Sequence, residues 1–166
     1  TGSQRSADRP SSDNVMNAVS AVEAAKSDAA EVLVCMHAST DDNACALHRG
    51  TRVRKNHTSR RDAFETVGAE PVGNVDYDSG TVEFRREYAE RDAVDLNVRT
   101  GLNGNVDLLK FTPGLDVDRY ADMLRDADID GLVIEGTGLG HVHTDLIPVV
   151  EELTDDGVVV AMTSQC

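Results

Sequence analysis

The sequence predicts an α/β protein, in which helices alternate with strands that form parallel sheets. The first observation is that short apolar runs alternate with amphipathic segments from residue 105 to the end, in the order β-α-β-α-β. The second is a helical pattern that is followed directly by a buried strand near the start of the chain. We therefore expect two α/β regions, residues 1–88 and 105–166, joined by a linker over residues 89–104.

The first region is expected to begin with a helix. Residues 11–14 carry Ser, Ser, Asp and Asn, which are the side chains that most often cap a helix N-terminus. Apolar residues then recur at helical spacing and predict one apolar face on a helix that ends near Ala30. These apolar residues are Val15, Met16, Val19 and Val22.

Strands and turns follow this helix. The apolar run over residues 32–36 predicts a buried strand, and residues 44–55 predict a second strand or hairpin arm after a polar turn. An Asp-Ser-Gly sequence at residues 78–80, followed by alternating residues, predicts a hairpin at the far edge of the region.

The second region has the more regular pattern. It predicts strands over residues 106–111, 131–135 and 158–163, with helices over residues 117–127 and 144–153 between them. Such a unit forms a parallel sheet with right-handed crossovers, and its ligands bind beyond the carboxyl ends of the strands. We therefore expect a ligand-binding site in the loops after the three strands.

The chain is strongly acidic. It carries 30 acidic and 16 basic residues, and a net charge of −14 disfavours broad attraction to nucleic acid or to an anionic membrane. Asp outnumbers Glu 20 to 10 and Arg outnumbers Lys 13 to 3, a bias that favours a halophilic source. No apolar run approaches the roughly 18 residues of a membrane span, and no signal peptide is visible, so we expect a cytoplasmic location.

The cysteines do not predict a crosslink or a metal site. Cys35, Cys45 and Cys166 are odd in number and contain no C-x-x-C pair, which argues against a disulfide framework and a zinc knuckle. We expect all three to be reduced and Cys35 to lie in the core.

Residues 49–61 hold six of the 16 basic residues and no acidic one. One interpretation is a basic hairpin that pairs with the acidic remainder of the chain. The other concerns Lys55, one of only three lysines in a chain that otherwise uses arginine. A desolvated lysine can lose its proton, whereas an arginine does not, so Lys55 is a candidate catalytic base.

A glycine-rich loop, residues 135–141, lies between a predicted strand and a predicted helix. Glycines such as Gly138 and Gly140 let the backbone approach a ligand, and a helix N-terminus favours an anion such as a carboxylate. The spacing is G-x-G-x-G and differs from the dinucleotide fingerprint G-x-G-x-x-G. A plain strand-to-helix turn is an equal alternative.

His141, His143 and Asp145 have an H-x-H-x-D spacing that could indicate a metal site. No fourth ligand lies close by in the sequence, and the other histidines belong to other predicted elements. We favour a pair of histidines at a helix start, with Asp145 near the positive end of the helix dipole, and expect no metal.

These segments occur together, in this order, in one protein family. Residues 1–14 resemble the loop and helix start after the second catalytic strand of type I asparaginases, residues 50–64 their lysine hairpin, and residues 136–142 the glycine loop that opens their C-terminal domain. Residues 9–13, Arg-Pro-Ser-Ser-Asp, resemble the D subunit of archaeal Glu-tRNA(Gln) amidotransferases more than free asparaginases. The resemblance covers nearly the whole chain.

The resemblance implies an internal fragment of a two-domain enzyme. The chain would comprise the back part of an asparaginase N-terminal α/β domain and the opening βαβαβ unit of the C-terminal domain. In this family a threonine attacks the amide carbon, and a second threonine, an aspartate and a lysine assist by proton transfer. Lys55 matches the lysine. The other groups precede the segment that resembles residues 1–14, so we expect the chain by itself to be inactive.

The resemblance also assigns the glycine loop a role in substrate binding. In asparaginases this loop reaches the active site of a neighbouring protomer in a homodimer, where an asparagine contacts the substrate. His141 occupies that place, with Gly138 and Gly140 beside it. An imidazole can still donate a hydrogen bond to a substrate carboxylate.

The leading hypothesis is hydrolysis of the glutamine amide, which supplies ammonia to convert Glu-tRNA(Gln) to Gln-tRNA(Gln). The amidotransferase partner, the E subunit, would hold the tRNA and use ATP and Mg, and the protein that carries this chain would need no cofactor. A free type I L-asparaginase is the first alternative. The second is a noncatalytic nucleotide-binding α/β module, which would explain the glycine loop but not the lysine hairpin.

The acidic composition generates a prediction about salt. We expect the thermal unfolding midpoint of the full-length protein to rise from low salt to molar KCl, because a Debye length of about 3 Å at 1 M screens repulsion between surface acids. Circular dichroism melts at both KCl concentrations measure the shift. Equal midpoints would contradict the halophilic adaptation.

Overall fold

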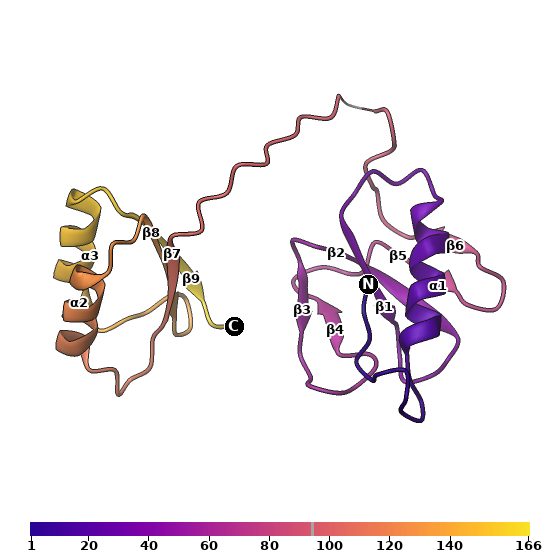
Figure 1. Cartoon of the computed structure of the whole chain (residues 1–166), viewed down its shortest axis with the longest axis horizontal. Helices are drawn as coiled ribbons and strands as arrows, with labels where there is room; N and C mark the ends of the chain where they lie inside the picture. Colours follow the sequence, from indigo (N-terminus) through magenta and orange to yellow (C-terminus); the bar gives the residue numbers. More distant parts are fainter. Residues whose placement is uncertain (94) are drawn as a thin grey trace. The chain divides into compact units, whose positions relative to one another are not determined.

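The computed structural model describes residues 1–93 and 95–166. The chain forms two compact units, Thr1–Asn97 and Val98–Cys166 (Figure 1). Residue 94 belongs to the predicted linker and lies outside the described residues, so the bounds of the linker stay a prediction. None of the helices in the described part of the chain has the length and apolar character of a membrane span.

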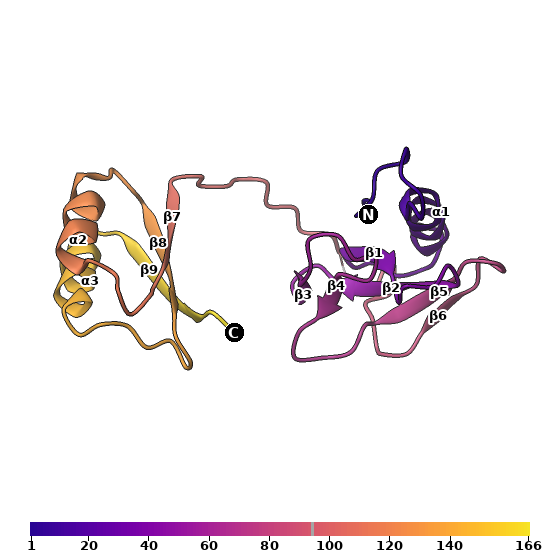
Figure 2. The same ribbon diagram turned by 90° about the horizontal axis from the view of Figure 1, so that it is seen from below.

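The first unit combines one helix with a four-stranded sheet in the order β1-β2-β5-β6. Figure 2 shows α1 lying across one face of this sheet. The elements are α1 (Asn14–Ala25), β1 (Leu33–His37), β2 (Ala44–Arg49), β5 (Gly73–Asp76) and β6 (Val82–Phe84).

All neighbours in this sheet pair antiparallel, so the expectation of a parallel sheet is wrong for the described strands of the first unit. Connection length gives the reason. A parallel pair needs a crossover of a dozen or more residues, whereas only residues 38–43 join β1 to β2. The hairpin predicted around residues 78–84 is confirmed by the β5-β6 pair.

The predicted strand over residues 44–55 is split by a turn. Its first half is β2, and its second half is β3 (Val53–Lys55), which pairs antiparallel with β4 (Phe64–Thr66) in a separate two-stranded sheet. The turn between the halves is closed by a 2.9 Å hydrogen bond from the Arg52 N–H to the Arg49 carbonyl. The basic segment therefore forms the expected hairpin arm.

Helix α1 buries a different face from the one that the sequence predicts. Its valines are between 44% and 65% exposed, so the predicted apolar face is wrong. Met16 is buried as expected, but beside it lie Asn17 and Ser20, at 0% and 1% exposure. The buried face is thus partly polar. The exposed valines are Val15, Val19 and Val22.

The core of the first unit forms between α1 and the sheet. Leu47 and Val75 at its centre are fully buried, and Cys35 is 4% exposed, which confirms that Cys35 belongs to the core. The three cysteines are free thiols. The buried apolar residues of this cluster are Met16, Cys35, Cys45, Leu47, Val72 and Val75.

The second unit is the predicted β-α-β-α-β arrangement. Its sheet has the order β7-β8-β9 and is parallel throughout, as expected. Helix α3 begins two residues later than predicted. The elements are β7 (Val106–Lys110), α2 (Val117–Asp126), β8 (Gly131–Gly136), α3 (Leu146–Asp155) and β9 (Val159–Ser164).

Both helices of the second unit cover the same face of its sheet, as Figures 1 and 2 show. Right-handed crossovers between adjacent parallel strands produce this arrangement. Alternate residues of β8, Leu132 and Ile134, point to that side and are 1% and 0% exposed. They pack against Leu146, Val149 and Leu153 of α3. The carboxyl ends of all three strands consequently lie at one edge of the sheet.

Candidate active site

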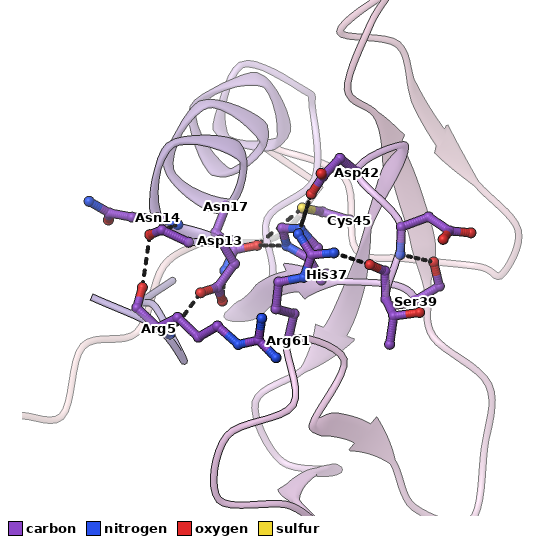
Figure 3. Close-up of polar contacts among 12 residues, drawn as sticks. Arg5, Asp13, Asn14, Asn17, His37, Ser39, Asp42, Cys45 and Arg61 are labelled. Atoms are coloured by element: carbon purple, nitrogen blue, oxygen red, sulfur yellow. Dashed lines mark hydrogen bonds and ion pairs between the residues drawn. The ribbon is translucent and has the colours of Figure 1, made fainter. Parts of the chain in front are cut away.

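A continuous path of hydrogen-bonded side chains runs through the first unit beside the N-terminal end of α1 (Figure 3). It consists of Asp13, Asn17, His37, Asp42 and Arg61, and is called the polar chain below. Asp13, Asn17 and His37 are at most 1% exposed. Polar groups are costly to bury without partners, so their hydrogen bonds are essential to this part of the fold.

Asp13 occupies the N-cap position of α1, but its side chain does not cap the helix. Among the predicted capping residues 11–14, the Ser12 hydroxyl accepts a 3.3 Å hydrogen bond from the Asn14 N–H at the start of α1. The Asp13 carboxylate accepts hydrogen bonds from the backbone N–H groups of Gln4 and Arg5, at 3.0 and 2.9 Å. The Ser3 hydroxyl is a further donor at 3.0 Å. Asp13 therefore holds the loop before the helix rather than the helix itself.

These contacts control the ionisation of Asp13. Burial raises the pKa of its carboxyl, but the N–H groups of Gln4 and Arg5 and the hydroxyl of Ser3 outweigh that effect and hold the pKa below its ordinary value. The side chain is therefore a carboxylate at neutral pH.

Asn17 links Asp13 to the next member of the polar chain. Its amide nitrogen donates to the Asp13 carboxylate at 2.8 Å and to the Gly2 carbonyl at 2.9 Å. Its amide oxygen lies 2.6 Å from Nδ1 of His37 and can only accept, so Nδ1 carries a hydrogen. On the other side of the ring, Nε2 of His37 lies 3.3 Å from a carboxylate oxygen of Asp42.

His37 is thus flanked by two acceptors, an arrangement that suits an imidazolium. Burial lowers the pKa of His37, but contacts with Cys45 and Asp42 outweigh it, and the pKa is raised above its ordinary value. The contact with His37 and the neighbouring Arg61 guanidinium lower the pKa of the Asp42 carboxyl. Opposite charges therefore meet at this point of the polar chain.

Arg61 ends the polar chain. Its guanidinium donates to the Asp42 carboxylate and to the Thr40 carbonyl. Only 12% of the Arg61 side chain is exposed, although Asp42 is 70% exposed. Arg61 lies in the loop between β3 and β4, so the polar chain connects the loop before α1 to the hairpin that carries Lys55.

Lys55 is the last residue of β3, where it pairs with Phe64 of β4 and is exposed. Its amine has no hydrogen-bond or ion-pair partner in the part of the chain that the structure describes. Arginines of the same basic segment are paired with acids: Arg49 with Glu31, Arg60 with Asp62 and Arg61 with Asp42. The predicted pairing with acids therefore holds for these three arginines, while the role of Lys55 stays a prediction.

The glycine loop in the second unit folds back on itself. Thr137 and His141 form an isolated antiparallel bridge, with backbone hydrogen bonds of 2.9 and 2.7 Å. Gly138 and Gly140 have φ angles of +53° and +98°, which favour glycine. A Cβ on Gly136 would lie 2.4 Å from the Gly140 carbonyl carbon. These glycines are therefore required for the shape of the loop.

Two residues at the end of β9 hold the glycine loop at the carboxyl edge of the sheet. The Ser164 hydroxyl donates to the Gly138 carbonyl. The side-chain amide of Gln165 donates to the carbonyls of Phe111 and, at 2.9 Å, of Glu135. This edge is where open α/β sheets bind ligands. Gln165 was not predicted as a site residue, although residues 163–166 belong to the segments that resemble the asparaginase family.

His141 is exposed and precedes α3 rather than opening it, because α3 begins at Leu146. The effect of a helix dipole is confined to the first turn, so the predicted dipole contribution at His141 is wrong. His143 instead accepts a 3.2 Å hydrogen bond from the Asp145 N–H. Within residues 1–93 and 95–166, no group of three or more His, Cys, Asp or Glu side chains is placed to hold a metal ion.

The predicted site residues thus fall into two groups. Gly138, Gly140 and His141 share one loop of the second unit, and Lys55 belongs to the hairpin of the first. Asn17, His37, Asp42 and Arg61 were not predicted as site residues. A signal did exist on α1, where Asp13, Asn17 and Ser20 recur at the spacing of one helix face.

Two family models match the chain. Residues 1–90 match "Asparaginase, N-terminal", and residues 105–166 match "Glutaminase/Asparaginase C-terminal domain". This chain belongs to the asparaginase family. Within that family, the predicted resemblance to the amidotransferase D subunit is confirmed by the relatives described next.

Three relatives carry the name of the D subunit of Glutamyl-tRNA(Gln) amidotransferase. The chain is 68% identical to the protein from Haloquadratum walsbyi and 60% identical to one from Halobacterium salinarum, and all of it is covered in both comparisons. It is 51% identical to the Methanosarcina mazei protein over 99% of its length. The chain spans 38% to 40% of the length of these relatives.

Solved asparaginase structures share the fold. The thermostable L-asparaginase from Thermococcus kodakarensis matches with a TM-score of 0.81 and 27% identity, over 99% of this chain and 47% of that one. A protein from Campylobacter jejuni, described as "Probable Cytoplasmic L-asparaginase", matches with a TM-score of 0.78 and 23% identity, over 99% of this chain and 53% of that one. These matches agree with the predicted fold class.

The buried carboxylate generates a prediction about pH. Replacing Asp13 with Asn should destabilise the full-length protein at pH 7 by about 1–3 kcal/mol, because an NH₂ group would face N–H donors. The folded-state pKa of Asp13 is lowered, so its contribution is complete above the unfolded pKa of about 3.9 and is lost as pH falls through the folded pKa. The difference in unfolding free energy between the two proteins should therefore shrink on acidification.

Urea unfolding of the wild type and Asp13→Asn between pH 7 and pH 3 measures this difference. Asp41→Asn, at an exposed position, is the matched control and should change little. A difference between the wild type and Asp13→Asn that stays constant with pH would contradict the assignment of Asp13 as a carboxylate held by the loop.

Proposed function

We propose that the full-length protein that carries this chain hydrolyses the side-chain amide of glutamine and supplies the ammonia for conversion of Glu-tRNA(Gln) to Gln-tRNA(Gln). The observation that carries the proposal is the 51% to 68% identity to the amidotransferase relatives along nearly all of the chain. Because the chain spans 38% to 40% of their length, the activity is assigned to the full-length protein.

Lys55 is the proposed proton-transfer group. A threonine in a segment preceding these residues is the proposed nucleophile, and an unassisted hydroxyl is a poor one near neutral pH. The proposal is supported by the Lys55 amine, which has no hydrogen-bond or ion-pair partner among the described residues, whereas Arg60 and Arg61 of the same hairpin loop are paired with acids. A neutral lysine amine can accept the proton of a hydroxyl nucleophile.

The glycine loop is the proposed substrate-binding element. Its bent backbone at Gly138 and Gly140 presents His141 at the surface, where the imidazole can donate a hydrogen bond to the α-carboxylate of the substrate. We propose that this contact is made to the active site of a second copy in a homodimer. An exposed His141 suits such a contact between protomers.

The tRNA is assigned to a partner. A net charge of −14 disfavours broad phosphate contacts, which supports a division of labour in which the E subunit holds Glu-tRNA(Gln) and uses ATP and Mg. The protein that carries this chain would then need no cofactor. We also propose that the protein is cytoplasmic and that residues 89–104 form a linker.

One observation favours a free L-asparaginase as the alternative: the fold matches the Thermococcus kodakarensis enzyme with a TM-score of 0.81. The nucleotide-binding alternative has less support. A phosphate site of that kind needs a helix N-terminus directly after the glycine loop. Here the loop closes through Thr137 and His141, and α3 begins only at Leu146.

Replacing Lys55 tests the proposed chemistry. Lys55→Ala in the full-length protein should lower kcat by about 10²–10⁴-fold, the usual contribution of a general base, and should leave the exposed hairpin folded. Lys55→Arg should not restore activity, because an arginine stays protonated. Ammonia release from glutamine and from asparagine, with and without the E subunit, measures both activity and substrate preference.

Lys26→Ala is the matched control, because Lys26 is an exposed lysine that forms its ion pair with Glu23, three residues away on the same turn. It should retain full activity. Near-wild-type hydrolysis by Lys55→Arg would overturn the role of Lys55 as a base. Preference for asparagine, together with activity that does not depend on the E subunit, would favour the free asparaginase.

Replacing His141 tests the binding role of the glycine loop. His141→Ala should raise KM for glutamine about tenfold to a hundredfold, because a hydrogen bond to a charged group contributes about 1.5–3 kcal/mol. His143→Ala, a neighbouring exposed histidine, should leave KM unchanged. Loss of activity on chelation, with recovery on adding zinc, would indicate a metal site instead, and an unchanged KM in His141→Ala would reject the contact.

A further inference from the structure

The hairpin that carries Lys55 has little packing of its own. It is a two-stranded sheet of three residues per strand, separate from the four-stranded sheet. An isolated two-stranded hairpin is marginally stable in water, so contacts with the rest of the unit must hold it in place. One such contact is the 2.9 Å hydrogen bond between Nδ1 of His48 on β2 and the Thr66 hydroxyl on β4.

A second contact holds the loop at the end of the hairpin. Two adjacent arginines of this loop differ in their exposure and in the residues that they contact. Arg61 is 12% exposed and reaches outside the hairpin to Asp42 and to the Thr40 carbonyl. Arg60 is 53% exposed and pairs with Asp62, two residues away in the same loop. Of these two arginines, Arg61 is therefore the one whose contacts restrain the loop against another part of the unit.

Asp42 can restrain Arg61 only if its own carboxylate is fixed. The Asp42 side chain is 70% exposed, and an exposed side chain can adopt several rotamers. His37, whose side chain is fully buried, lies against it at 3.3 Å and is itself locked by the 2.6 Å contact to Asn17. The buried part of the polar chain thus orients its exposed end.

We propose that Asp42 and Arg61 are positioning residues for amide hydrolysis, with His37 orienting Asp42, Asp42 holding Arg61, and Arg61 fixing the hairpin that carries Lys55. The inference rests on the proposed function, in which Lys55 transfers a proton. At its other end the same polar chain holds the N–H groups of Gln4 and Arg5 through Asp13. The loop before α1 and the hairpin that carries Lys55 are therefore fixed along one hydrogen-bonded path.

The sizes of two effects, the loss of rate and the change in Tm, distinguish a positioning role from a contribution to general stability. The Asp42 carboxylate is 70% exposed and stays solvated by water when Arg61 is replaced, so losing their contact should change Tm only slightly. Proton transfer depends far more steeply on position, since a displacement of about 1 Å can cost about 10²-fold in rate. A loss of rate with little change in Tm is therefore the signature of positioning.

Arg61→Ala in the full-length protein should lower kcat for glutamine about tenfold to a hundredfold, change KM less than about twofold, and leave Tm nearly unchanged. Arg60→Ala, with the same change of side chain one residue earlier, should match the wild type. Arg61→Lys should recover part of kcat, because one donor can still reach Asp42. Equal kcat values in Arg61→Ala and Arg60→Ala would overturn the proposal.

A double-mutant cycle tests the coupling. Asp42→Ala should reproduce Arg61→Ala, and the combined variant should lose no more kcat than either single change, because both remove the contact between Asp42 and Arg61. Asp41→Ala is the control at a neighbouring exposed aspartate. Losses that multiply in the combined variant would show independent roles and overturn the coupling.

Hydrogen exchange separates this inference from the role of Lys55. The Asn56 N–H bonds to the Ala63 carbonyl at 2.7 Å next to Lys55, and its exchange should accelerate in Arg61→Ala but not in Arg60→Ala. If Lys55→Ala proves active, the proposed role of Lys55 fails, and the exchange result still decides whether Arg61 fixes the hairpin. Equal exchange in both arginine variants would overturn the restraint itself.

Discussion

The burial of one negative charge governs the architecture of the first unit. A carboxylate removed from water is strongly unfavourable unless donors surround it, and Asp13 at 0% exposure obtains them from Gln4, Arg5, Ser3 and Asn17. Satisfying Asp13 therefore fixes the loop before α1. It also commits Asn17 to face His37, which starts the path that reaches the lysine hairpin.

The two units hold their candidate site residues in place in different ways. In the first, side chains from separate elements meet in a buried polar chain that ends on an exposed hairpin. In the second, glycine conformations and backbone hydrogen bonds shape a single loop at the carboxyl edge of a parallel sheet. One arrangement suits a group that must be held accurately for proton transfer, and the other suits a surface that presents a donor to a substrate.

Acidic side chains hold several arginines of the basic segment in place. The excess of acids supplies partners for arginines, and Arg49, Arg60 and Arg61 each take one. Arginine suits this use because it stays charged and binds carboxylates through several donors. Lys55, like Arg52 and Arg54 of the same segment, forms no ion pair among the described residues. A chain rich in acids and arginine can thus keep a lysine amine available beside a dense set of ion pairs.

The sequence by itself predicted the α/β class, the βαβαβ unit, the hairpins and the family, because these depend on local periodicity, turn residues and contiguous motifs. Tertiary structure decided the antiparallel pairing of β1 with β2, the partly polar face of α1 and the loop-holding role of Asp13. It also assembled Asn17, His37, Asp42 and Arg61 into one polar chain. Their partners lie far apart in sequence, and whether a buried polar side chain is tolerated depends on which donors and acceptors the folded chain brings to it.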